Sequence, residues 1–261
     1  MHKEERTLRN VQRDGVEILV AIEGEGPSLV VLPSYGRDGF KDFDEFTDRL
    51  VHHGLQVVRP QPRGIAGSQG PLHGIDLTSL AADVAAVIEA VAGGRAIVLG
   101  HAFGSFVARV LSVERPDTVR GVILAAASAT VVAPDINATP FIAGDPTRPE
   151  QERLAALRKA FFAPDHDPGI WLDGWYPTAL AAQHEAVKRT ILAPYWFGGR
   201  APLLEIIPRH DPFKPEERWS ELRDKVGDRA TTVVVENAAH ALFPEQPGRV
   251  AELVLEWIEK L

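Results

Sequence analysis

The sequence contains no cysteine, which excludes disulfides, thiolate nucleophiles and metal sites with thiolate ligands. It also lacks any apolar run of the roughly 18 residues that a membrane-spanning helix needs. The segment from Met1 to Asn10 is charged and has no apolar stretch of the kind found in signal peptides. We therefore expect a protein that is not inserted in a membrane and that resides in the cytoplasm.

Positively charged residues are also fewer than negatively charged ones. Lysine and arginine number 28 against 36 aspartate and glutamate residues, and the formal net charge is -8. Such an acidic chain is a poor match for nucleic acid or for an anionic membrane surface, so we expect a small-molecule partner. The composition, 45% hydrophobic and 25% charged over 261 residues, is that of an ordinary globular protein, long enough for one large α/β domain or two small ones.

Short apolar segments alternate with amphipathic segments along most of the chain. Such alternation is typical of a parallel sheet that is covered by helices on both faces. Ligands of these sheets bind at the carboxyl ends of the strands. A turn signal at Asp14-Gly15 adds an antiparallel pair at the sheet edge. The strands are predicted at Thr7–Gln12, Val16–Ile22, Ser28–Leu32, Leu55–Arg59, a run that begins at Ala96, Val119–Ala125, Leu203–Ile207 and Thr231–Val235.

The alternation breaks between residues 126 and 200, where no strand is indicated. A capping-box pattern, Thr147-Arg148-Pro149-Glu150, predicts one helix, and the stretch from Pro177 to Ile191 predicts another. We therefore predict one α/β domain with a small helical cap inserted after the sixth core strand. Its core comprises residues 1–127 and 201–261, and the cap covers about 128–200.

The run from Ala96 ends in Gly100-His101-Ala102-Phe103-Gly104, and a helix begins at once. A strand, a sharp turn between two glycines and a helix form the geometry of a nucleophile elbow, usually written G-x-S-x-G. The residue at the tip adopts a strained backbone conformation, and its neighbours are small so that strand and helix can pack. Here the tip is Ala102, which has no nucleophilic atom.

Two further polar residues follow later strands. Asp211 lies in Pro208-Arg209-His210-Asp211-Pro212-Phe213, directly after a predicted strand, and His240 follows the last predicted strand by a few residues. The chain order is therefore elbow, Asp and His, which is the order of a Ser-Asp-His hydrolase on this kind of sheet. His210 has no partners at metal-ligand spacing, so we predict no metal site.

These segments, G-H-x-F-G-S at 100–105, H-D-P-F at 210–213 and A-A-H-A-L-F-P-E-Q-P at 238–247, resemble the α/β-hydrolase superfamily over nearly the whole chain. The resemblance implies that Ala102 takes the place of the nucleophile. It further implies that His240 is the general base and that Asp211 orients its imidazole. The backbone N–H groups of Phe103 and Tyr35 would form the oxyanion hole.

The sequence departs from the family pattern in two places, and the aromatic residues of the predicted cap guide the expected substrate. Pro33-Ser34 stands where the family often has His-Gly, and Gln61 stands where it often has Asp. We expect hydrolysis of an apolar, aromatic or cyclic carboxylic ester or lactone, without a metal or organic cofactor; carbon–carbon bond hydrolysis shares the same machinery. The predicted substrate-binding residues are Ser34, Trp171, Trp175, Tyr176, Trp196 and Phe197.

Ala102 leaves three hypotheses. In the first, the chain is a Ser→Ala variant of a working serine hydrolase, which would keep the pocket and lose the chemistry. In the second, it is a natural non-hydrolytic homologue that binds a ligand. In the third, His240 acts on the substrate directly, as in a nucleophile-independent lyase or a cofactor-free oxygenase. The first is our working hypothesis, because a binding protein has no need of both Asp211 and His240.

Overall fold

The computed structural model describes residues 6–261, so the expectation for Met1–Asn10 falls partly outside the described residues. It contains an eight-stranded sheet in the order β1-β2-β4-β3-β5-β6-β7-β8. The strands are β1 (Thr7–Arg13), β2 (Val16–Glu23), β3 (Ser28–Leu32), β4 (Gln56–Pro60), β5 (Ala96–His101), β6 (Val119–Ala125), β7 (Leu203–Pro208) and β8 (Ala230–Val235).

The helices fall between these strands as the alternation predicts. They are α1 (Asp44–His52), α2 (Leu77–Val91), α3 (Phe103–Glu114), α4 (Pro134–Asn137), α5 (Thr139–Ala143), α6 (Glu150–Ala160), α7 (Pro177–Arg189), α8 (Glu221–Val226), α9 (Leu242–Glu245) and α10 (Pro247–Ile258). β1 and β2 form the predicted antiparallel hairpin, β2 is antiparallel to β4, and every pairing from β4 to β8 is parallel.

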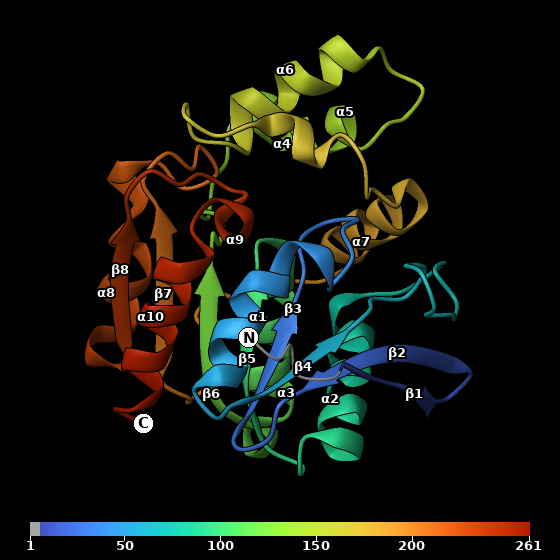
Figure 1. Cartoon of the computed structure of the whole chain (residues 1–261), viewed down its shortest axis with the longest axis vertical. Coiled ribbons are helices and arrows are strands. Elements are labelled where there is room, and N and C mark those ends of the chain that lie inside the picture. Colours follow the sequence, from blue (N-terminus) through green and yellow to red (C-terminus); the bar gives the residue numbers. More distant parts are fainter. Residues whose placement is uncertain (1–5) are drawn as a thin grey trace.

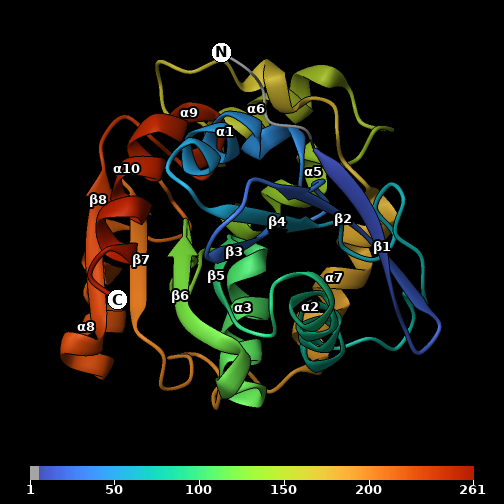
Figure 2. The same ribbon diagram turned by 60° about the horizontal axis from the view of Figure 1, so that its bottom comes forward.

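Two helical layers cover the sheet (Figure 2). One apolar cluster joins one face of the sheet to α2, α3 and α8, and a second joins the other face to α1, α9 and α10. All six residues of β5 are buried, as expected for a central strand with helices on both sides. The predicted α/β architecture is therefore confirmed.

The parallel register brings several strand ends to one edge. Leu32 of β3 pairs with Gly100 of β5, and His101 pairs with Ala125 of β6. The loops after β3, β5, β7 and β8 consequently leave the sheet on the same side. Figure 1 shows α4, α5 and α6 beyond this edge, with α7 beside the core.

The segment 128–200, which we call the cap segment, contains no strand among its residues, all of which the structure describes. α7 confirms the helix predicted from Pro177. The predicted capping box at Thr147 does not form: α6 begins at Glu150 with Pro149 as its N-cap, and no side chain caps it. Thr147 instead belongs to a turn ahead of the helix, in which its N–H and its hydroxyl both donate to Asp145 Oδ1, at 2.9 and 2.6 Å.

The turn between β5 and α3 depends on two glycines. A Cβ atom at Gly100 would lie 2.3 Å from the Gly104 carbonyl oxygen, and one at Gly104 would lie 2.4 Å from the Leu32 carbonyl oxygen. The obstructing atoms are backbone, which cannot rotate away as a side chain can. β3, β5 and α3 therefore approach one another at distances that exclude any side chain at these positions.

We predict that Gly104→Ala lowers the free energy of unfolding by about 1–3 kcal/mol, because the added methyl group overpacks the β3–α3 contact. Gly248→Ala is the matched control. A Cβ there, in the first turn of α10, meets only the Arg49 guanidinium at 3.1 Å, and that side chain can move. Urea unfolding of both variants measures the difference, and equal stabilities would contradict this account of the elbow.

Candidate functional site

Asp211 and His240 form a buried pair at the carboxyl edge of the sheet. His240 Nδ1–H donates to Asp211 Oδ2 at 3.0 Å, and Phe213 N–H donates to Asp211 Oδ1 at 2.9 Å. Both carboxylate oxygens are therefore engaged, which fixes the plane of the carboxyl group and the orientation of the imidazole. With Nδ1 held by Asp211, Nε2 is the ring nitrogen of His240 that remains for a ligand.

Aromatic rings hold the His240 imidazole from two sides. The Phe213 ring centroid lies 4.1 Å away at an interplanar angle of 33°, and Phe161 contacts the imidazole edge-on at 5.5 Å. Phe161 follows α6, so the cap segment and the core both pack on the same histidine. This packing restricts the imidazole to one rotamer.

His101, next to Ala102 in the chain, is buried at the end of β5. Its Nε2–H donates to the backbone carbonyl of His240 at 2.7 Å. Burial lowers the pKa of His101 to about 3, with a further contribution from the nearby His240. His101 is therefore a neutral hydrogen-bond donor that ties the strand of the elbow to the loop that carries His240.

Ala102 lies at the tip of the turn with φ 48° and ψ -108°, one of few residues other than glycine with positive φ. Its N–H donates to Ala125 O at 2.9 Å, and its carbonyl accepts from Ser105 N–H at 3.0 Å. These bonds hold the strained conformation on both sides of the residue. Ala102 also lines the cavity that contains His240, so the elbow presents position 102 to that cavity.

The cavity lies between the sheet edge and the cap segment. Its empty volume is about 1020 Å³, with the open space at its mouth included. Among the described residues, its lining includes no aspartate, glutamate, lysine or arginine. The lining residues are Ser34, Tyr35, Ala102, Phe103, Phe106, Ser128, Ala129, Thr130, Val132, Asn137, Pro140, Phe141, Phe161, Trp175, His184, Val187, Leu192, Trp196, Phe213 and His240.

The predicted substrate-binding residues divide into two groups. Ser34, Trp175 and Trp196 line the cavity. The structure places the other three elsewhere: Trp171 is buried in the aromatic cluster of the cap segment, Tyr176 borders a separate surface depression, and Phe197 packs against the core. Some aromatic residues of the cap segment pack inside it and others line the cavity, and the amino-acid composition does not distinguish these two roles.

Several lining residues were missed by the sequence analysis. Phe106 lies on α3 just beyond the elbow, and His184 lies on α7. The His184 ring contacts Phe141 at 4.7 Å and Tyr35 at 6.4 Å. The helical spacing of Leu180, His184 and Val187 is the signal that would have indicated a buried face of α7.

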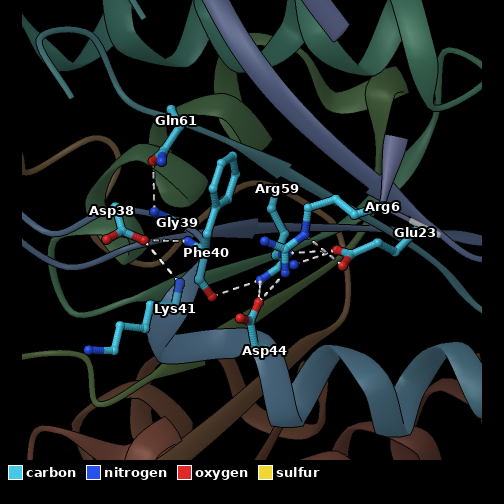
Figure 3. A network of polar contacts seen from close by, with 9 residues as sticks. All are labelled: Arg6, Glu23, Asp38, Gly39, Phe40, Lys41, Asp44, Arg59 and Gln61. Carbon is cyan, nitrogen blue, oxygen red and sulfur yellow. Dashed lines mark hydrogen bonds and ion pairs between the residues drawn. The ribbon is translucent and has the colours of Figure 1, made fainter. Parts of the chain in front are cut away.

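Tyr35 and Phe103, the predicted oxyanion-hole residues, lie side by side at the cavity, with ring centroids 4.6 Å apart. Tyr35 belongs to the loop that follows β3, and the core holds the far end of this loop (Figure 3). Gly39 N–H donates to Gln61 Oε1 at 2.8 Å, and Arg59 Nη1 donates to the Phe40 carbonyl at 2.8 Å. Gln61, where the resemblance led us to expect Asp, therefore supports this loop through a neutral amide.

Among residues 6–261 no group of three or more His, Asp or Glu side chains is arranged to hold a metal ion. No helix in the same range is long and apolar enough to cross a bilayer.

Comparison with known proteins agrees with this geometry. Residues 29–253 match the family model described as "Alpha/beta hydrolase family", and the chain belongs to that family. It is 25% identical to the AB hydrolase superfamily protein YfhM of Bacillus subtilis (strain 168), covering 95% of this chain and 96% of that protein.

Solved structures show the same fold. The enol-lactonase from Burkholderia xenovorans LB400 superimposes with a TM-score of 0.80 at 20% identity, over 96% of this chain and 100% of that one. The esterase EaEST from Exiguobacterium antarcticum gives 0.78 at 21% identity, over 96% and 98% of the two chains.

We predict that His101 makes the fold sensitive to acid. Its folded-state pKa lies below its unfolded value of 6.5, so the unfolded chain binds the extra proton, and stability falls as pH drops below 6.5. His101→Gln keeps a donor for the His240 carbonyl and removes this proton. Between pH 4 and 6 the parent should lose stability more steeply than the variant, by up to about 1.4 kcal/mol per pH unit. Chemical unfolding across this range, with the exposed His53→Gln as control, measures the difference, and parallel curves for parent and His101→Gln would contradict it.

Proposed function

We propose that this site is that of a serine-type hydrolase acting on uncharged carboxylic esters or lactones, with position 102 as the place of the nucleophile. In this proposal, Ala102 leaves the chain able to bind its substrate and unable to form an acyl-enzyme. The observation that carries the proposal is the intact Asp211–His240 hydrogen bond beside a strained elbow that opens into the same cavity. The hydrogen-bonded pair or the strained elbow alone could serve only the fold. Together, beside one cavity, they match the requirements of ester hydrolysis by a serine nucleophile.

The proposed reaction requires serine at position 102. His240 Nε2 takes the hydroxyl proton as the oxygen attacks the ester carbon, and the carbonyl π electrons move to oxygen. The N–H groups of Phe103 and Tyr35 donate to the resulting oxyanion. His240 then protonates the leaving alkoxide as the carbon–oxygen bond breaks. Water, activated by the same imidazole, releases the acid, and Asp211 stabilises the imidazolium in both steps.

The lining of the cavity supports an uncharged substrate. Its aromatic and aliphatic side chains offer apolar contact, and its polar groups, such as Ser34 and Asn137, are neutral hydrogen-bonding groups. A charged substrate group would lose its hydration here without gaining a counterion in the lining. An ester or lactone carries dipoles but no charge, so it fits this surface.

A second candidate function rests on Ala102 itself. The chain keeps the Asp211–His240 pair without an oxygen at position 102, and a base beside an oxyanion hole can remove a proton from a bound ligand directly. This candidate requires turnover by the chain with Ala102 in place. The first candidate requires the nucleophile to be restored.

We predict that Ala102→Ser raises kcat/KM for short aryl esters or for members of a lactone panel by about 10³-fold or more, because loss of a serine nucleophile costs factors of this order. Burst kinetics should accompany the gain. Adding His240→Ala to the same protein should return the rate to within about 10-fold of the parent chain.

Three outcomes are informative. A folded Ala102→Ser protein that hydrolyses no member of the panel would contradict the proposal. Gain of activity that persists after His240→Ala would contradict the role of the imidazole. Turnover by the unmodified chain, abolished by His240→Ala, would instead establish direct base chemistry.

We predict that the Ala102→Ser protein discriminates against negative charge. The p-nitrophenyl ester of hexanoic acid and the mono-p-nitrophenyl ester of adipic acid have acyl chains of equal length and differ by a terminal methyl group or carboxylate. The neutral ester should have a kcat/KM about 10-fold or more above that of the anionic one, since a carboxylate in this cavity is desolvated without a partner. Equal rates would show that the acyl group does not occupy the cavity.

A further inference from the structure

We propose that Gln183, on helix α7 of the cap segment, is a positioning residue that holds the Tyr35 amide in place for the oxyanion. The inference rests on the proposed function, because it concerns the same oxyanion hole. It extends that function by making a residue of the cap, remote in sequence from the predicted triad positions, part of the machinery that sets the rate.

The central contact is a buried hydrogen bond between the cap and the loop after β3. Gly36 N–H donates to Gln183 Oε1 at 2.8 Å, and the Gln183 side chain is 2% exposed. Gly36 directly follows Tyr35, so this bond acts at the peptide next to the Tyr35 amide that we assign to the oxyanion hole. Because Gly36 N–H is a donor, only the oxygen of the Gln183 amide can accept from it, and this fixes the orientation of the side-chain amide.

The amide nitrogen of Gln183 differs from its oxygen in hydrogen bonding. Gln183 Nε2 is buried and has no hydrogen-bond partner among the described residues. Here only the acceptor is used, and it is used on the loop that carries Tyr35.

Further contacts also hold Gly36 against the cap segment. Tyr176 N–H donates to the Gly36 carbonyl at 2.8 Å, so both backbone groups of Gly36 are bonded to the cap segment. Gly36 has φ +57°, and a Cβ there would lie 2.7 Å from Leu180 Cβ, which shows how closely α7 approaches the loop. Leu180, Gln183 and His184 thus present one face of α7 to residues 35 and 36.

The loop is held from two sides. The core fixes its far end at Gly39 and Phe40 through Gln61 and Arg59, as Figure 3 shows. The cap fixes its near end at Gly36. Tyr35 lies between Pro33, whose carbonyl accepts from Gly104 N–H at 3.1 Å, and Gly36. Loss of the Gln183 acceptor therefore loosens the Gly36 side of Tyr35, while the Tyr176 bond to the Gly36 carbonyl and the core anchors remain. Misplacement of a reacting or stabilising group by about 1 Å can cost about 100-fold in rate.

The test uses the Ala102→Ser protein as the reference. Gln183→Met keeps the length and volume of the side chain and removes the acceptor. We expect kcat to fall by about 10- to 100-fold with KM changed by less than about 3-fold, because the oxyanion forms only in the transition state. An aryl trifluoromethyl ketone, which adds to the serine and places an oxyanion in the hole, should lose affinity by about the same factor as kcat/KM.

Two further variants separate positioning from general stability. Gln183→Glu retains an oxygen that can accept from Gly36 N–H. Because burial favours the protonated, uncharged form of a carboxyl group, this variant should recover most of the lost kcat. Gln151→Met is the matched control, since Gln151 is exposed on α6 of the same cap segment. It should leave kcat, KM and inhibitor affinity unchanged.

A rise in KM alone for Gln183→Met, or unchanged affinity for the trifluoromethyl ketone, would overturn the inference. If Ala102→Ser itself is inactive, the proposed function fails, and amide hydrogen exchange in the Ala102 chain decides about Gln183 separately. Exchange at Gly36 N–H, which loses its acceptor, should then be faster in Gln183→Met and unchanged in Gln151→Met. Unchanged exchange in both would overturn the positioning role, and Gln183→Leu, which also removes the acceptor, provides the same comparison if the methionine variant does not fold.

Discussion

Close backbone packing around position 102 is the constraint on which the rest of the site depends. Gly100 and Gly104 allow β3, β5 and α3 to approach at distances that exclude a Cβ atom. The turn between them forces Ala102 to positive φ. A strained residue is kept in place only because its surroundings hold it, and here two backbone hydrogen bonds do so. The result is a side-chain position aimed at the cavity.

The other groups of the site reach the same cavity because the parallel register brings their loops to one edge. Asp211 and His240 follow β7 and β8, and Tyr35 follows β3. Each loop is then fixed by groups outside the proposed chemistry: His101 bonds the His240 carbonyl, and Gln61 and Gln183 bond the loop of Tyr35. The cap segment therefore contributes support as well as a wall of the cavity.

The sequence predicted the sheet, the elbow, and the order of Ala102, Asp211 and His240, because these depend on local signals: apolar runs, paired glycines, and polar residues directly after strands. It did not predict which cap aromatics line the cavity. Trp175 and Trp171 have similar local sequence contexts, yet one faces the cavity and the other is buried against Phe161 and Phe162. That difference depends on the path of the cap over the core, which no local pattern specifies. Gln183 was missed for the same reason, since its partner Gly36 is distant in sequence.

The central claim is that position 102, His240 and the two amides form one nucleophile site. Intact-mass spectrometry of the Ala102→Ser protein after treatment with a fluorophosphonate tests it most directly, because this reagent labels a serine that is activated by a base and an oxyanion hole. We expect one adduct, located at residue 102 by peptide mapping, and strongly slowed labelling when His240→Ala is added. A folded Ala102→Ser protein that remains unlabelled would contradict it.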